Sequence, residues 1–168
     1  SLQITLKSKL ILSALRKTYY RLLRKIRKRM KDRFLSAFQR LQISNPSIKS
    51  DEPTKNKYRE LWDKSKYASM ANMVDGNYSE IAYRLFVLSS FIGVKESNRV
   101  LQRSLMSCGE TLLDDGEIGP NTKALLLSHG WKLIYPLRSE AAGYFRTLAE
   151  KDSNVKKQLN DLLEKAYS

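Results

Sequence analysis

The first 45 residues contain no proline and no glycine, and their apolar residues recur at steps of three and four. At about 100° per residue these positions fall within a stripe about 160° wide, which predicts one long amphipathic helix over residues 1–45. The stripe consists of Leu12, Leu15, Tyr19, Leu22, Leu23, Ile26, Met30, Phe34, Phe38 and Leu41. The helix has to end before Pro46, because a residue that precedes proline avoids the α region. Residues 1–9 fit the helix less well, because their alternating apolar residues are also typical of a short strand or a frayed terminus.

This segment also carries almost all of the excess charge of the chain. Residues 1–41 hold 13 Lys and Arg against one acid, Asp32, whereas residues 42–168 hold 18 Lys and Arg against 16 acids. Of the net charge of +14, +12 therefore lies on this one helix and only +2 on the rest of the protein. The side chains expected to contact an anionic surface are Arg16, Lys17, Arg21, Arg24, Lys25, Arg27, Lys28 and Lys31.

Three interpretations of this helix follow from its two faces. In the first, the apolar stripe packs along its length on the domain and the basic face is merely solvated. In the second, the basic face binds an anionic polymer such as nucleic acid, teichoic acid or peptidoglycan. In the third, the helix lies on a membrane surface. The stripe would equally suit a second copy of the chain, which predicts a homo-oligomer through the N-terminal helix.

The remainder of the chain is predicted to be helical, with an apolar content that allows a buried core. Residues 46–56 are polar and contain two prolines, which indicates a linker. Asp75-Gly76 is typical of a turn. Further helices are predicted over about 54–71, 77–91, 95–106, 120–129, 131–148 (kinked or restarted at Pro136) and 152–167. The predicted fold is an all-α compact bundle of about six or seven helices, divided into the basic helix 1–45, the linker 46–56 and a helical domain 57–168.

Residues 82–127 carry a resemblance to a known family. The segment 82–93 ends in Gly93, a Leu-Gln helix follows at 100–105, and 115–122 reads Asp-Gly-Glu-Ile-Gly-Pro-Asn-Thr. This order resembles the C-terminal half of the lysozyme-like N-acetylmuramidases of glycoside hydrolase family 108. The resemblance extends over about residues 57–168, and a similar loop marks a broader set of peptidoglycan-binding domains. It implies peptidoglycan binding, with Asp115, Gly116, Gly119 and Thr122 as candidate ligand-binding residues. The same residues also have a structural reading, because two glycines, a proline and an Asn or Thr suit a tight turn that begins a helix.

The sequence departs from that family where catalysis is expected. The family's muramidases carry a glutamate in an early Glu-Gly-Gly-Tyr motif, but this chain has no Glu before Glu52 and no Gly before Gly76. Val87 and Ser90 occupy positions where the family has Asp and Asn. Glycosidic cleavage needs a carboxylic acid to protonate the leaving oxygen. We therefore predict no catalytic residue and interpret the chain as a degenerate, muramidase-like pseudoenzyme of phage or bacterial type.

An active hydrolase with a relocated acid is the enzymatic alternative. The carboxylates weighed for that role are Asp51, Glu52, Glu60, Asp63, Glu80, Asp114, Asp115 and Glu117. Their spacing does not match a calcium loop. With one cysteine, Cys108, and one histidine, His129, a disulfide framework and a Cys/His zinc site within one chain are excluded. No metal and no cofactor is predicted.

Three functions are therefore expected in order of preference. The first is a peptidoglycan-associated, non-catalytic protein that binds the cell wall or a protein partner. The second is a structural or assembly protein, for instance of a virion, whose basic helix binds nucleic acid or another anionic surface. The third is an active cell-wall lysozyme or endolysin. The sequence shows no signal peptide and no transmembrane segment, which predicts a cytoplasmic, virion-associated or non-classically exported protein.

Overall fold

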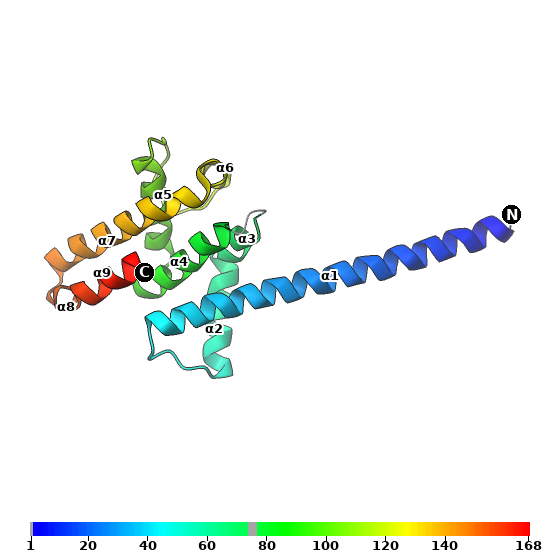
Figure 1. Cartoon of the computed structure of the whole chain (residues 1–168), viewed down its shortest axis with the longest axis horizontal. Coiled ribbons are helices and arrows are strands. Elements are labelled where there is room, and N and C mark those ends of the chain that lie inside the picture. Colours follow the sequence, from blue (N-terminus) through cyan, green and yellow to red (C-terminus); the bar gives the residue numbers. More distant parts are fainter. Residues whose placement is uncertain (1, 74–76) are drawn as a thin grey trace.

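A computed structural model describes residues 2–73 and 77–168, without the side chains of 2–7, 9, 10 and 77. In these residues the chain forms helices joined by loops and contains no strand, which confirms the predicted all-α class. The helices are α1 (Leu2–Ser44), α2 (Glu52–Lys64), α3 (Tyr67–Ala71), α4 (Asn77–Ile92), α5 (Val94–Ser107), α6 (Pro120–His129), the 3-10 helix η1 (Gly130–Leu133), α7 (Ile134–Lys151), α8 (Ser153–Lys157) and α9 (Leu159–Tyr167). Figure 1 shows α2–α9 gathered into a compact body, from which α1 projects as a long arm. The predicted turn at Asp75-Gly76 lies outside the described residues.

The helix boundaries follow local signals. The α1 helix ends at Ser44, two residues before Pro46, and α2 begins after Asp51, whose carboxylate accepts a hydrogen bond of 2.8 Å from the Thr54 amide. Gly93 has φ +85° and separates α4 from α5. Pro136 lies in the first turn of α7, where a missing amide hydrogen costs nothing, so it does not kink the helix.

Three predicted helices are each divided in the structure. The predicted helix 131–148 comprises the 3-10 helix η1 and then α7, which begins at Ile134. The predicted helix 54–71 is interrupted at Lys66, whose left-handed backbone (φ 67°) separates α2 from α3. The Lys66 ammonium donates a hydrogen bond of 3.2 Å to the carbonyl of Ile118, which fixes this break against a distant loop. The predicted helix 152–167 is divided into α8 and α9 at Gln158. Neither the break at Lys66 nor that at Gln158 is signalled by a proline or glycine beside it.

The core is centred on α4, which packs against α1, α3, α5 and η1. An aromatic cluster joins α4 to α1 and α2. The ring of Phe86 lies 5.2 Å from that of Trp62 and 6.5 Å from that of Phe34, both edge to face. Phe38 of α1 meets Tyr58 of α2 at 6.0 Å. The root of α1, residues 34–44, is therefore part of the core.

Candidate functional site

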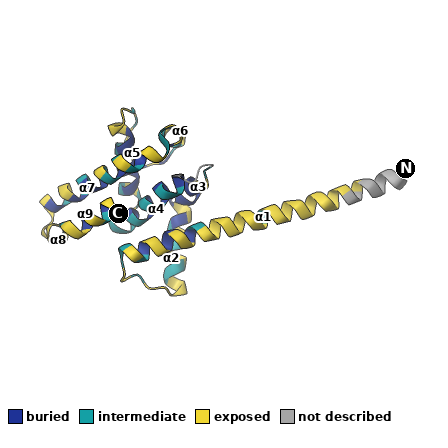
Figure 2. Ribbon diagram, viewed as in Figure 1, coloured by how far each residue is buried: buried dark blue, intermediate teal, exposed yellow. Residues whose placement is uncertain are grey.

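Most of the apolar stripe of α1 is exposed to solvent. Leu12, Leu15 and Leu22 are 65%, 61% and 56% exposed, whereas Phe34 at the root of the helix is 2% exposed. Figure 2 shows this change along α1, from exposed in the arm to buried where the helix enters the body. The interpretation that the whole stripe packs on the domain is therefore wrong, because the body is only long enough to cover the last three turns. We call residues 8–33 the arm; at 1.5 Å per residue it is about 40 Å long.

The arm presents ten cations between residues 16 and 33. All eight side chains predicted to contact an anionic surface are exposed on it. Within the described part of the chain, none of these ten cations forms an ion pair. Arg33, where the arm meets the body, has a lowered pKa because of burial and then because of the positive charge of Arg29. The arm is thus a dense and uncompensated positive charge.

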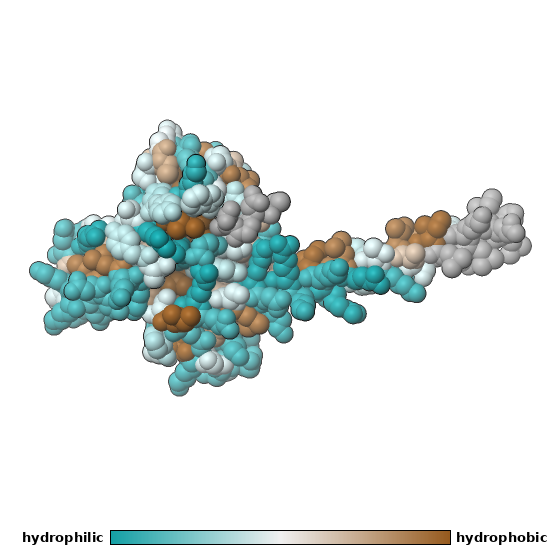
Figure 3. All heavy atoms as spheres, viewed as in Figure 1, coloured by the Kyte–Doolittle hydropathy of each residue, from teal (hydrophilic) through white to brown (hydrophobic). Residues whose placement is uncertain are grey.

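The two faces of the arm point in different directions relative to the body. At 100° per residue, the centre of the basic face lies about 160° round the helix from the centre of the apolar stripe. Arg40 contacts Glu80 and the ring of Tyr83, which places α4 on the stripe side of α1. Figure 3 shows apolar residues along one side of the arm and hydrophilic residues along the other. The basic face is therefore directed away from α4.

The 115–122 loop is held to α5 by a set of internal hydrogen bonds. Gln102 Nε2 donates to Asp115 Oδ1 at 2.9 Å and to the Glu117 carbonyl at 3.0 Å, while its Oε1 accepts from the Gly116 amide at 2.8 Å. Asp115 Oδ1 also accepts from the Glu117 amide at 2.9 Å. The Gln102 and Glu117 donors lower the pKa of Asp115. This carboxylate is thus engaged within the protein.

The other candidate ligand-binding residues of the loop have structural surroundings. A Cβ on Gly116, whose φ is +82°, would lie 2.6 Å from Lys95 Cγ and 2.8 Å from the Lys95 carbonyl oxygen. Gly119 precedes Pro120 at the start of α6 and has open space around it, and Thr122 is buried. The structure therefore brings Asp115, Gly116 and Gly119 together in one loop, with Thr122 beneath it.

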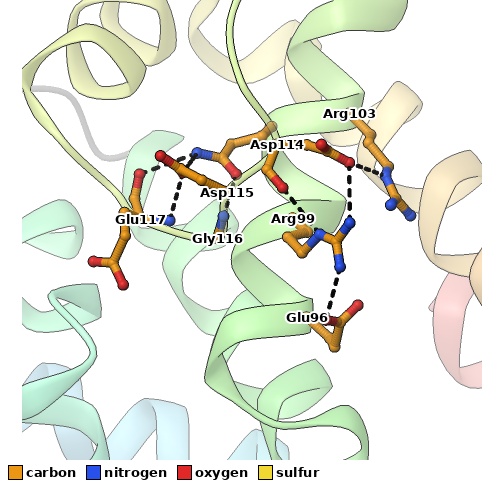
Figure 4. Close-up of polar contacts among 8 residues, drawn as sticks. Glu96, Arg99, Arg103, Asp114, Asp115, Gly116 and Glu117 are labelled. Carbon is orange, nitrogen blue, oxygen red and sulfur yellow. Dashed lines mark hydrogen bonds and ion pairs between the residues drawn. The ribbon is translucent and has the colours of Figure 1, made fainter.

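A charged network flanks the loop on the α5 side. Arg103 Nε donates to Asp114 Oδ2 at 2.7 Å, and Arg99 bridges Asp114 and Glu96 (Figure 4). The Arg103 hydrogen bond is the main cause of the lowered pKa of Asp114. The Arg99 and Arg103 pairs were not predicted from the sequence, although their spacing of four on one helix face places both side chains beside the loop.

A polar groove of about 450 Å³ lies between α5 and α7, next to this network. Its charged and aromatic lining comprises Glu96, Arg103, Glu140, Tyr144 and Lys151. Burial, and then the charge of Glu96, raise the pKa of Tyr144. Sequence reasoning missed Glu96 and Glu140, because residues 44 positions apart meet only once α5 and α7 pack together.

Four of the carboxylates weighed as relocated acids have surroundings that disfavour the role of a general acid. Such a group needs a raised pKa, which burial usually provides. The four whose pKa is perturbed all have it lowered instead, by hydrogen-bond donors. They are Asp51, beside Thr54; Glu60, beside Lys64; Asp114; and Asp115. Glu80 forms ion pairs with Arg40 and Arg84.

Within residues 2–73 and 77–168, no cluster of His, Cys, Asp and Glu is arranged to hold a metal ion. In the same residues, no helix combines the length and hydrophobicity needed to span a bilayer. A scan against protein-family models and searches of curated proteins and of solved structures give no match.

Proposed function

We propose that this protein is a non-catalytic attachment protein that binds nucleic acid through the basic face of its arm. The observation that carries the proposal is the set of ten cations between residues 16 and 33, against the single acid Asp32, on a helix that protrudes from the body. In this account the root of α1 anchors the arm, and α2–α9 form the body that is held at the nucleic acid.

The charge density of the arm suits a phosphate backbone. Ten cations are spread over 18 residues, or about 27 Å of helix at 1.5 Å per residue. Duplex DNA carries one negative charge per roughly 1.7 Å of its axis, and each phosphate neutralised by Lys or Arg releases counterions. Such contacts carry no base information, so we expect binding with little sequence preference.

The orientation of the arm favours a nucleic acid over a flat bilayer. A bilayer would have to cover the apolar stripe, yet α4 and the helices packed on it lie on the stripe side of α1. The basic face is directed the other way. A partner that is recognised by phosphate charge alone can approach that face without meeting α4.

Charge-reversed variants test the proposal. Arg24→Glu, Arg27→Glu and Lys28→Glu, combined in one protein, should weaken binding to a fluorescent 30-base-pair duplex more than tenfold in anisotropy titrations at low salt. The matched control combines Lys132→Glu, Arg146→Glu and Lys156→Glu, which are exposed on the body and change the net charge equally. Equal weakening by both sets, or absence of binding by the unmodified protein at low salt, would contradict the proposal.

Cell-wall binding by the body is a second candidate, favoured by the groove between α5 and α7. The groove adjoins the loop that resembles a peptidoglycan-binding motif, since Arg103 both lines the groove and binds Asp114. A mixture of carboxylates, cations and the Tyr144 ring is suited to hydroxyl and amide groups of a saccharide. The candidate predicts that the protein sediments with purified sacculi at near-physiological salt and that Tyr144→Ala reduces this binding. Release of muropeptides would instead support the active hydrolase.

A further inference from the structure

A second pocket lies where the root of α1 meets α4, α7 and α9, away from both the arm and the groove. Its volume is about 220 Å³, equivalent to about seven water molecules. This is below the roughly 300–1,000 Å³ of sites for drug-sized ligands, so the pocket suits a smaller molecule. Its lining combines two kinds of side chain, apolar residues including Phe91, Leu137 and Phe145, and cations.

Four cations surround this pocket. They are Arg40, Arg84, Arg138 and Lys165. Glu80 pairs with Arg40 at 2.6 Å and with Arg84 at 3.0 Å, and Asp161 pairs with Lys165 at 2.7 Å. Among side chains, two carboxylates thus stand against four cations, and neither of these carboxylates lines the pocket. The pocket wall therefore carries an excess of positive charge.

Arg84 and Arg138 converge on one acceptor. Their Nη2 atoms donate to the Ser168 carbonyl oxygen at 2.8 Å and 3.2 Å. The Nε atom of Arg138 is buried and has no hydrogen-bond partner. Burial lowers the pKa of Arg84; the charge of Glu80 opposes this effect, and the positive charges of Arg138 and Arg40 add to it. Glu80 compensates the charge of Arg84, whereas Arg138 forms no ion pair with a carboxylate side chain of the described residues, so an anion beside Arg138 would compensate its charge.

The remaining cations lie over aromatic rings beside the apolar lining. Arg40 lies 4.9 Å from the centroid of the Tyr83 ring, and Lys165 lies 5.3 Å from that of Phe91. These contacts hold charged groups beside apolar side chains at low energetic cost. A molecule in the pocket would thus find apolar surface and positive charge within a few ångströms.

We propose that this pocket binds a small amphiphilic anion, namely a carboxylate or phosphate monoester attached to a short alkyl chain or a single ring. The anionic group accepts a hydrogen bond from the buried Nε atom of Arg138, which has no hydrogen-bond partner among the described residues. The apolar group packs on Leu137 and Phe145. The site is independent of nucleic-acid binding by the arm, since none of its lining residues belongs to residues 8–33.

Calorimetric titration of the full chain with octanoate and with octyl phosphate, below their micellar concentrations, tests the proposal. We expect saturable binding of at least one of the two; the stronger binder identifies the anionic group. Octanol, which lacks the charge, and inorganic phosphate, which lacks the chain, should each bind at least tenfold more weakly. Equal binding of octanol or of inorganic phosphate would overturn the proposal, as would absence of saturable binding by both anions.

Two variants locate the site. Arg138→Gln should weaken binding at least tenfold, whereas Arg146→Gln, an identical change of charge at an exposed position of the same helix, should leave it within twofold. Ala141→Leu should weaken binding by filling the pocket without changing its charge. Circular dichroism establishes that each variant is folded. Equal binding by folded Arg138→Gln and Arg146→Gln variants would contradict the assignment.

Discussion

Gln102 of α5 and Asp115 of the loop are joined by a hydrogen bond of 2.9 Å, and the same amide group binds the Gly116 amide and the Glu117 carbonyl. The Gln102 side chain thus holds this loop by three hydrogen bonds, as a neighbouring strand would do through its backbone. Gln102 is 1% exposed, so removing it leaves the buried amide of Gly116 without its hydrogen-bond acceptor. We expect Gln102→Ala to lower the free energy of unfolding by about 2–3 kcal/mol in urea denaturation. Gln39→Ala, at an exposed position, should change it by less than about 0.5 kcal/mol.

Replacement by alanine should change the stability of the fold in opposite directions at Gly116 and Gly143. Gly116→Ala places a Cβ against the Lys95 backbone at a positive φ and should destabilise the fold by about 1–3 kcal/mol. Gly143 lies within α7 with open space around it, so Gly143→Ala should stabilise by about 0.5–1 kcal/mol. Thermal unfolding shows whether each substitution raises or lowers the unfolding temperature. A change in the same direction for both variants would contradict this account of the loop.

The Asp114–Arg103 pair predicts a defined acid sensitivity. The folded protein lowers the pKa of Asp114 below its ordinary 3.8, so the unfolded chain binds the proton more readily. The contribution of this pair is present above about pH 4 and is lost as the pH falls through the folded pKa. Arg103→Gln should raise the pKa of Asp114 in an NMR titration and reduce the loss of stability below pH 4. An unchanged Asp114 pKa would show that Arg103 does not hold this carboxylate.

Truncation of apolar side chains should separate the root of α1 from the arm. Phe38 is buried against Tyr58, so Phe38→Ala should cost about 3–5 kcal/mol of unfolding free energy. Leu15 is solvent-exposed, so Leu15→Ala should change it by less than about 0.5 kcal/mol. A large loss of stability in the Leu15 variant at low protein concentration would mean that the stripe is covered within one chain.

Self-association of two arms through the apolar stripe is a separate prediction. Added salt should strengthen this association, whereas it should weaken the binding of nucleic acid. Arg16 and Arg27 lie on one edge of the stripe, and Lys25 and Arg29 on the other, so two paired arms would bring like charges together. Any dimer of arms should therefore strengthen as salt screens this repulsion. Sedimentation velocity over a concentration series at low and high salt measures it. A dimer that weakens with salt would contradict this arrangement.

The sequence predicted the all-α class and most helix boundaries because these depend on local signals. Pro46 and Gly93 each mark a helix end that the structure confirms. The extent of the core on α1 was not predictable in the same way. Leu15 and Phe38 belong to one stripe with one periodicity, and only the size of the folded body decides which of them is buried.

The same distinction between local spacing and long-range packing applies to the candidate sites. The basic face of α1 follows from helical spacing alone, because all its residues share one helix. The pocket and the groove could not be predicted, because each depends on packing between distant segments. Arg84 and Arg138, for example, are 54 residues apart and meet only through the contact of α4 with α7 and α9. Nothing in the spacing of these arginines distinguishes them from surface residues.

The salt dependence of duplex binding tests the central proposal most directly. Plotting log K against log salt concentration should give a slope of about −4 or steeper, corresponding to about five or more neutralised phosphates. Neutralising Arg24, Arg27 and Lys28 to Gln should reduce the slope by about 2.7, that is, about 0.9 per lost contact. A slope near zero, or one that the three substitutions leave unchanged, would contradict the proposal that the basic face of the arm binds nucleic acid.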